Sequence, residues 1–242
     1  MTAWTYASTI EVAMDTDALV SVSKKNFLRA ASIPWLRIGI HLIGLFPLAE
    51  LAYKWVADQL TVNPIQFIEQ FLGRAALNLL VATLAVTPLV TLTGWKKISK
   101  HRRALGLYTF LYFALHFTTF AALDYGFDFG QILQLTLQKP FIWVGTLAGI
   151  LLLALAATSF KYWMKRLGRN WNRLHKLVYL IGGLVVLHYA WAVKGSLSTL
   201  GGNIARPLFM GFLVSILLVL RIPPVKRGVI ALRQRILRKS TN

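Results

Sequence analysis

Residues 167–194 read LGRNWNRLHKLVYLIGGLVVLHYAWAVK, a basic segment that runs into an apolar span long enough for a membrane helix. The span carries His175 near its start and His188 near its end. Thirteen residues of α-helix give a rise of about 19.5 Å inside a hydrocarbon core of about 30 Å. Histidines at such depths are uncommon and usually functional, and a haem iron is one partner for their polar nitrogens. The stretch therefore predicts a helix that helps to hold haem and to pass electrons across a membrane.

The composition extends this prediction to the whole chain. Of the 242 residues, 56% are hydrophobic and only 14% are charged, which is too apolar for an ordinary soluble domain. The absence of cysteine excludes disulfides, iron–sulfur clusters, zinc thiolate sites and thiolate-ligated haem. We therefore expect an all-α integral membrane protein, a six-transmembrane-helix bundle whose apolar segments cover about 38–57, 75–93, 106–123, 141–160, 177–194 and 204–220.

Three regions are expected along the chain. Residues 1–34 read as an N-terminal cytoplasmic tail without a cleavable signal peptide of the usual form, and Met14 is an alternative start. Residues 35–221 read as the six-helix transmembrane haem-binding domain. Residues 222–242 read as a basic cytoplasmic C-terminal tail, too short for a nicotinamide or flavin reductase domain.

The basic residues predict the orientation. Of the 27 Lys and Arg residues, 22 fall at the N-terminal side, the second and fourth loops and the C-terminal tail, and the alternate loops hold four: Arg74, Lys139, Lys194 and Arg206. Because basic loops stay on the cytoplasmic side, both termini are expected in the cytoplasm. The net charge of +19 is explained by this bias, so we expect no nucleic-acid partner.

Two histidines are expected to meet at one depth. His116 lies fourteen residues beyond Arg102, and His188 lies thirteen beyond His175, in two spans that run in the same direction. His116 and His188 should thus lie at a similar level near the outer side. Two imidazoles on two helices at one level are what a six-coordinate b-type haem requires, so both are predicted axial iron ligands.

The inner level is less determined by the sequence. His175 is a predicted iron ligand there, and Arg102 is predicted to balance haem charge by binding propionates. His101 is an alternative second ligand, although its place in a basic loop favours a solvated position. The glycine pair Gly182 and Gly183 is expected to allow a kink or a close haem approach. One haem and two haems both remain open.

Two further residues receive structural readings. His41 could line a quinone or flavin site, but a structural role is favoured. Met210 could bind iron in principle, but packing is favoured. We expect no catalytic residue in this chain.

The chain also lacks a Gly-rich phosphate loop and a dinucleotide fingerprint. Electrons should therefore come from a separate donor, either a membrane quinol or a soluble flavoprotein that docks on the basic face. Two alternatives stay open: a stand-alone transmembrane ferric or oxygen reductase, and a non-redox transporter or scaffold whose histidines only pack or relay protons.

Four blocks carry a resemblance to a known family: GRAALNLLVATLAVTPL (73–89), RRALGLYTFLYFALHF (102–117), LGRNWNRLHKLVYL (167–180) and LHYAWAVK (187–194). In this order they resemble the MsrQ (YedZ) family, the haem-binding membrane subunits of bacterial periplasmic methionine sulfoxide reductase systems. That family belongs to the ferric reductase-like transmembrane group.

The resemblance implies haem b, an associated FMN and electrons from the quinone pool or a cytosolic flavin reductase. The electrons would pass to MsrP, a periplasmic molybdopterin-dependent partner that reduces methionine sulfoxide and so repairs oxidised proteins. The family's haem histidines match His116, His175 and His188. NADPH oxidase-like relatives carry a further histidine where this sequence has Arg102, so the ligand opposite His175 is left open.

Overall fold

The computed structural model describes residues 35–193, 195–196, 201–202 and 204–239. The predicted N-terminal tail, residues 1–34, lies outside them. The chain divides into units of residues 1–39 and 40–242, and the contacts described below lie within the second unit.

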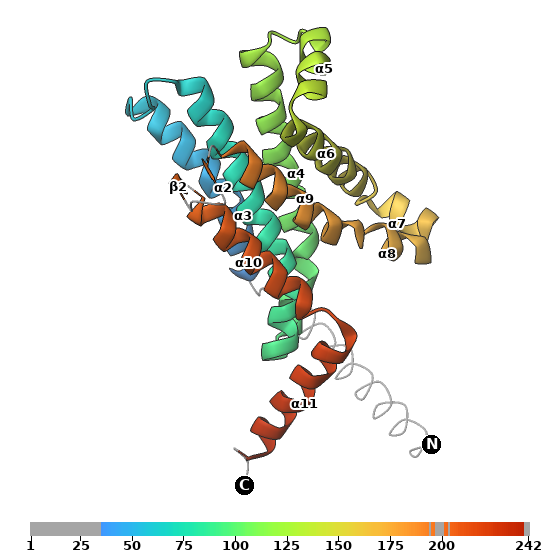
Figure 1. Ribbon diagram of the computed structural model, residues 1–242. Coiled ribbons are helices and arrows are strands. Elements are labelled where there is room, and N and C mark those ends of the chain that lie inside the picture. The colour runs from blue at the N-terminus through green and yellow to red at the C-terminus, as the bar shows by residue number, and fades with distance from the viewer. Residues whose placement is uncertain (1–34, 194, 197–200, 203, 240–242) are drawn as a thin grey trace, which may run out of the picture. The chain divides into compact units, whose positions relative to one another are not determined.

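The described chain is almost entirely helical (Figure 1). Its elements are α2 (Trp35–Val56), α3 (Pro64–Thr93), the 3-10 helix η1 (Lys96–His101), α4 (Arg102–Thr119), the π-helical turn η2 (Phe120–Asp124), α5 (Phe129–Gln138), α6 (Pro140–Ala157), α7 (Lys161–Leu167), α8 (Arg169–Leu174), α9 (Leu177–Ala192), α10 (Ala205–Val219) and α11 (Pro223–Lys239). Two short strands, β1 (Gly195–Ser196) and β2 (Gly201–Gly202), pair antiparallel between α9 and α10.

The predicted fold class is confirmed. Within the described residues, five helical segments are long and apolar enough to cross a membrane: α2, α3, η1 through η2, α6, and α8 with α9. The pair α10 and α11, which bends by 79°, makes up to six. Large apolar side chains cover the outside, such as Phe46, Phe209 and Phe212, as expected for helices that face lipid rather than water.

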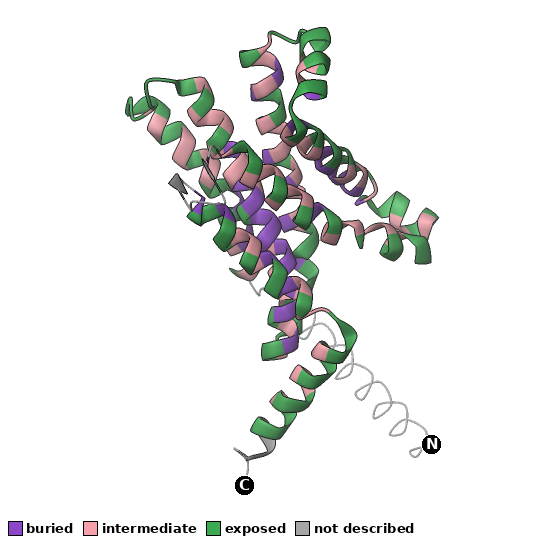
Figure 2. Ribbon diagram, in the orientation of Figure 1, coloured by how far each residue is buried: buried purple, intermediate pink, exposed green. Residues whose placement is uncertain are grey.

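Helix α3 forms the centre of the packing. Its residues Leu77, Leu80, Val81 and Leu84 join buried residues of α6, α9 and α10 in one apolar core. Figure 2 shows the buried residues gathered along this region, whereas α5, α7, α8 and α11 are mostly exposed. The core therefore fixes α4, α6 and α9, the helices that carry the candidate site, around one central helix.

Proline breaks the hydrogen-bond ladder of α2, and α4 repairs it. Pro47 lies inside α2, and beside it the Tyr112 hydroxyl donates to the Gly44 carbonyl at 2.8 Å and accepts from the Leu48 backbone N–H at 3.1 Å. In a regular helix that N–H and that carbonyl would bond each other. The fully buried Tyr112 side chain thus replaces the lost bond and joins α2 to α4.

A second proline is compensated from the other end of the chain. Pro88 lies inside α3 and has no N–H to offer the carbonyl of Leu84, four residues earlier. Arg221, between α10 and α11, donates to this Leu84 carbonyl, and its guanidinium lies 4.9 Å from the Tyr179 ring centroid. At both prolines, a side chain from another part of the chain thus bonds the helix backbone beside the break.

The helical segment that carries His175 and His188 is irregular near His175, not at the glycine pair where the sequence predicted a kink. Helix α9 runs unbroken through Gly182 and Gly183, and a Cβ on Gly182 would lie 3.2 Å from Leu84, so this glycine serves helix packing rather than a kink or haem approach. Instead, i→i−3 hydrogen bonds tighten the chain at His175 and Lys176. This overwinding changes the direction of His175 around the helix axis relative to that of His188.

Candidate functional site

His116 and His188 line one cavity of about 430 Å³ between α4, α5, α6 and α9. The other walls are mainly apolar and aromatic, including Phe110, Phe113 and Phe117 of α4. The predicted meeting of the two histidines at one level is therefore observed. The size and the apolar lining fit a bound cofactor with few polar contacts.

The His116 ring is held by α3. Its Nδ1 atom lies 2.9 Å from the backbone oxygen of Glu69. Because a carbonyl oxygen can only accept, Nδ1 carries the proton and donates. Gly73, one turn later in α3, faces the same ring, and a Cβ there would lie 3.3 Å from its nearest atoms.

The His188 ring is held in the same way by α6. Its Nδ1 atom donates to the Phe141 carbonyl at 2.8 Å. Gly145 follows one turn later, and a Cβ there would lie 2.6 Å from Nδ1, a distance that real Cβ atoms essentially never show. The close approach of ring and helix therefore requires glycine at this position.

The two half-sites repeat at a constant shift along the chain. The carbonyls that accept from the rings belong to residues 69 and 141, the glycines are 73 and 145, and the histidines are 116 and 188, so each member differs from its counterpart by 72 positions. Gly73 and Gly145 were not predicted from the sequence, and this shared spacing is the signal that could have found them.

This arrangement leaves both Nε2 atoms available to bind a metal. With the Nδ1 proton donated to a backbone carbonyl, the lone pair of the neutral ring lies on Nε2. Two neutral imidazoles on facing walls of an apolar cavity match the donor set of a six-coordinate b-type haem. The residues present thus fit the group that the sequence predicted, and their role as iron ligands stays a prediction.

His175 and Arg102 come together at the other end of the helices, about 21 Å from His116 along α4. The charge of Arg102 acts on the His175 ring. The Trp171 ring stacks on His175 at 4.0 Å, and the Thr158 hydroxyl lies 3.3 Å from its Nε2 atom. The Arg102 side chain also reaches Thr87 at 3.4 Å, so it lies among polar groups at the end of the helices.

The expected solvated position of His101 is wrong. Its side chain is only 8% exposed, because the 3-10 turn of η1 directs it inward just before α4 begins. A basic neighbourhood in the sequence did not reveal this, since Lys100 and Arg102 on either side are exposed.

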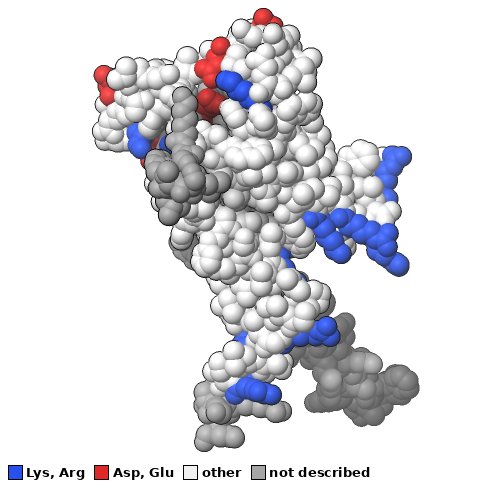
Figure 3. Space-filling model, viewed as in Figure 1, with Lys and Arg blue, Asp and Glu red and all other residues white. Residues whose placement is uncertain are grey.

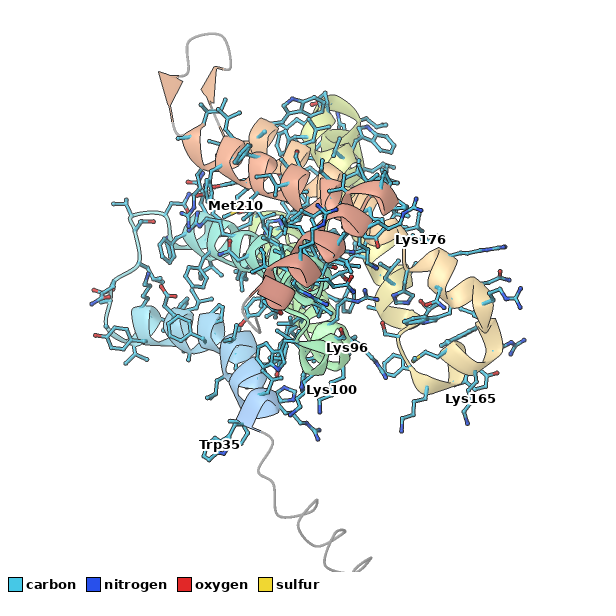
Figure 4. The ribbon with its side chains drawn as sticks, turned by 90° about the horizontal axis from the view of Figure 1, so that it is seen from below. Trp35, Lys96, Lys100, Lys165, Lys176 and Met210 are labelled. Atoms are coloured by element: carbon cyan, nitrogen blue, oxygen red, sulfur yellow. The ribbon has the colours of Figure 1, made fainter. Side chains whose placement is uncertain are left out.

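The packing role predicted for Met210 is confirmed, and the structural role favoured for His41 stays a prediction. His41 Nδ1 lies 2.8 Å from the Tyr108 hydroxyl, which joins α2 to α4. Met210 packs against the apolar core (Figure 4). Neither residue lines the cavity of His116 and His188.

The charges separate along the helices. Figure 3 shows Asp and Glu mainly at the end that carries the α2–α3 and α4–α5 turns, and Lys and Arg mainly at α7, α8 and the opposite end. In the view from below, Lys96, Lys100, Lys165 and Lys176 mark the basic side, and all four are exposed (Figure 4). The cavity of His116 and His188 lies toward the acidic end, because Glu69 is part of its wall.

Comparison with known proteins places this geometry in context. Residues 72–186 match a family model described as "Ferric reductase like transmembrane component". These residues include His116 and His175 and end two residues before His188.

Three relatives, from Herminiimonas arsenicoxydans, Ralstonia nicotianae and Bordetella pertussis, are each named protein-methionine-sulfoxide reductase heme-binding subunit MsrQ. The chain is 41% identical to the first over 76% of its own length and 82% of the relative's. It is 38% identical to the second over 84% and 92% of the two lengths, and 37% identical to the third over 81% and 92%.

Proposed function

The chain belongs to the MsrQ family of ferric reductase-like transmembrane proteins, and from this we propose that it is the haem-binding, electron-transferring membrane subunit of a methionine sulfoxide reductase system. One observation carries the proposal. His116 and His188 line one apolar cavity, each with its Nδ1 proton donated to a backbone carbonyl and its Nε2 atom left to bind iron.

At the acidic end, His116 and His188 would hold the haem iron through their Nε2 atoms. The backbone carbonyls of Glu69 and Phe141 fix the Nδ1–H tautomer and the orientation of the rings, and the aromatic side chains of α4 line the cavity between them. Haem b, when bound here, supplies a one-electron redox centre whose potential the surrounding protein tunes.

At the basic end, His175 is a further ligand and Arg102 balances the charge of haem propionates. Trp171 orients the His175 ring by stacking, and the Thr158 hydroxyl lies within hydrogen-bond distance of the His175 Nε2 atom. Iron binding by this nitrogen would replace the Thr158 contact. Arg102 is exposed at the start of α4, so its guanidinium is available to carboxylates.

The direction of electron flow follows from the charge distribution. The basic end faces the cytoplasm in the inner membrane, with both termini on that side. Electrons enter from the quinone pool or from a cytosolic flavin reductase, with FMN as an associated cofactor implied by the family alone. They leave toward the periplasmic molybdopterin enzyme MsrP, on which methionine sulfoxide is reduced.

Reconstitution tests this function directly. The purified chain, loaded with haem and placed in liposomes, is mixed with a reduced quinol and the visible spectrum is followed. We expect the haem bands to become reduced, and to be reoxidised only when MsrP and methionine sulfoxide are both added. Rapid reoxidation by oxygen or ferric iron alone, with no effect of MsrP, would contradict the proposal.

A further inference from the structure

A second cavity of about 470 Å³ lies between α2 and α3 and reaches α10. Its walls combine aromatic and aliphatic side chains with several charged ones. The charged and amide-bearing residues are Glu50, Lys54, Arg74, Asn78 and Arg206, and the largest apolar residues are Phe46, Phe67 and Phe71.

The charges in this cavity do not balance. Lys54 pairs with Glu50 at 2.9 Å and lies over the rings of Phe67 and Phe71, 5.7 and 5.6 Å from their centroids. Two arginines are then left, Arg74 and Arg206, whose positive charges act on each other.

Among the described residues, Arg74 has no anionic hydrogen-bond partner. The hydrogen bond that Arg74 makes in the described chain goes to the neutral Gln70 side chain at 3.4 Å. Two guanidinium groups at a membrane-spanning bundle are costly without an opposite charge. The site therefore calls for an anionic ligand.

This site is distinct from the histidine cavity. Gly73 turns toward His116, whereas Arg74 is the next residue and lies about 140° around α3 from Glu69. The two cavities share no lining residue. The arginines thus face away from the space between His116 and His188, on the other side of α3.

The position and the walls indicate what kind of anion binds. Lys54 lies in the last turn of α2, so the charged part of the cavity is at the level of a helix end, where lipid headgroups lie. Below it, the cavity is lined by Phe46 and Ile43, which are 63% and 59% exposed on the outside of the bundle. A free phosphate ion would need the arginines alone, whereas an acyl chain also uses this apolar wall.

We propose that this cavity binds an anionic phospholipid, with the phosphate between Arg74 and Arg206 and an acyl chain along Phe46 and Ile43. Guanidinium groups bind phosphate oxygens through paired, charge-assisted hydrogen bonds, which gives the site its preference for this headgroup. The proposal does not depend on the electron-transfer function.

Native mass spectrometry of the purified chain in a neutral detergent tests it. We expect one phosphatidylglycerol to remain bound, and phosphatidylcholine to bind more weakly by about tenfold, because its choline cation offsets the phosphate charge beside the two arginines. The variant Arg206→Gln and the double variant Arg74→Gln with Arg206→Gln should lose the lipid. Arg206 is exposed, so its single variant is expected to fold. The matched control Lys139→Gln, which removes an exposed cation outside the cavity, should keep it.

Four results would overturn the proposal. Equal lipid retention by the wild-type chain and both arginine variants would show that the arginines do not hold the headgroup. Equal binding of inorganic phosphate, or recovery of a neutral quinone instead of phospholipid, would assign the cavity to another ligand. Loss of haem without loss of lipid in the variants would assign the arginines to the haem propionates.

Discussion

His116 and His188 differ from His41 and His175 in what holds their rings. Each has its Nδ1 atom on a backbone carbonyl of a neighbouring helix, whereas His41 bonds the Tyr108 hydroxyl and His175 contacts Thr158. A backbone carbonyl cannot donate, so it fixes one tautomer, while a hydroxyl accepts or donates. The pair is thus preorganised for metal binding before any metal is present.

Gly145→Ala tests this preorganisation. In an ordinary helix the change is expected to stabilise the chain by about 1 kcal/mol, but here the new Cβ would lie 2.6 Å from His188 Nδ1 and displace the ring. We expect haem affinity to fall about 10–100-fold, as for other changes that disturb a ligand's orientation. The measurement is haem retained per protein, titrated in detergent.

Gly183→Ala is the matched control. It is also a glycine within a membrane helix, but nothing lies within 4 Å of its added Cβ. Haem affinity should stay at the wild-type value. A loss of the same size in both variants would show that helix geometry, not the His188 contact, is responsible.

At the residue level, the sequence predicted that His116 and His188 meet, but not which groups hold their rings. His116 and His188 lie nearly the same number of residues beyond the basic starts of their helices. Because helical rise is constant, this was enough to place them at one depth. The carbonyls of Glu69 and Phe141 carry no side-chain signal, and so they were not predicted. The buried position of His101 depends on a 3-10 turn that its basic sequence does not announce.

Among the elements, α2 is joined to the bundle largely through α4. Tyr112 bridges the backbone gap at Pro47, and the Tyr108 ring fills the space over Gly44, where a Cβ would lie 2.5 Å from it. The proline and the tyrosine therefore act as a pair, since the Tyr112 hydroxyl bonds a carbonyl and an N–H group beside Pro47.

Tyr112→Phe should destabilise the chain by about 1–3 kcal/mol, because the Gly44 carbonyl and the Leu48 N–H lose their shared partner in a buried position. Tyr162→Phe, which removes an exposed hydroxyl on α7, should change stability by less than about 0.5 kcal/mol. Denaturant unfolding in detergent measures both. Equal stability of the two variants would refute the bridging role.

A double-mutant cycle tests the second proline. Arg221→Gln should cost about 1.5–3 kcal/mol in the wild-type chain, because it leaves the Leu84 carbonyl without its donor. In a Pro88→Ala background, residue 88 supplies the missing N–H, so the same change should cost less by about 1 kcal/mol. Additive effects of the two substitutions on unfolding would mean that Arg221 acts only through Tyr179.

The elements themselves were largely predictable, and their irregularities were not. Six apolar segments of sufficient length predicted the spans, because lipid demands continuous hydrophobicity. Helix α5 was not foreseen, since its apolar residues are interleaved with glutamines and it begins at an Asp128 cap rather than in a long apolar run. The sequence predicted a kink at Gly182 and Gly183, whereas the irregularity lies at His175. Glycines are visible in a sequence, but backbone overwinding is not.

For the whole molecule, the separation of charge predicts the orientation in the membrane. The basic end holds η1, α7, α8 and α11, and positive loops are retained in the cytoplasm. A fluorescent reporter fused after Asn242 should therefore be active, and alkaline phosphatase fused there should be inactive. Fusions at Phe127, in the α4–α5 turn, should give the opposite pattern. Phosphatase activity after Asn242 would reverse the orientation and with it the proposed direction of electron flow.

The visible and electron paramagnetic resonance spectra of the chain, purified from cells supplied with haem, test the central claim most directly. We expect a low-spin, six-coordinate haem signal that is lost in both His116→Ala and His188→Ala and retained in His41→Ala, whose histidine lies outside the cavity. An unchanged low-spin signal in either of the first two variants would contradict ligation of iron by this pair of histidines.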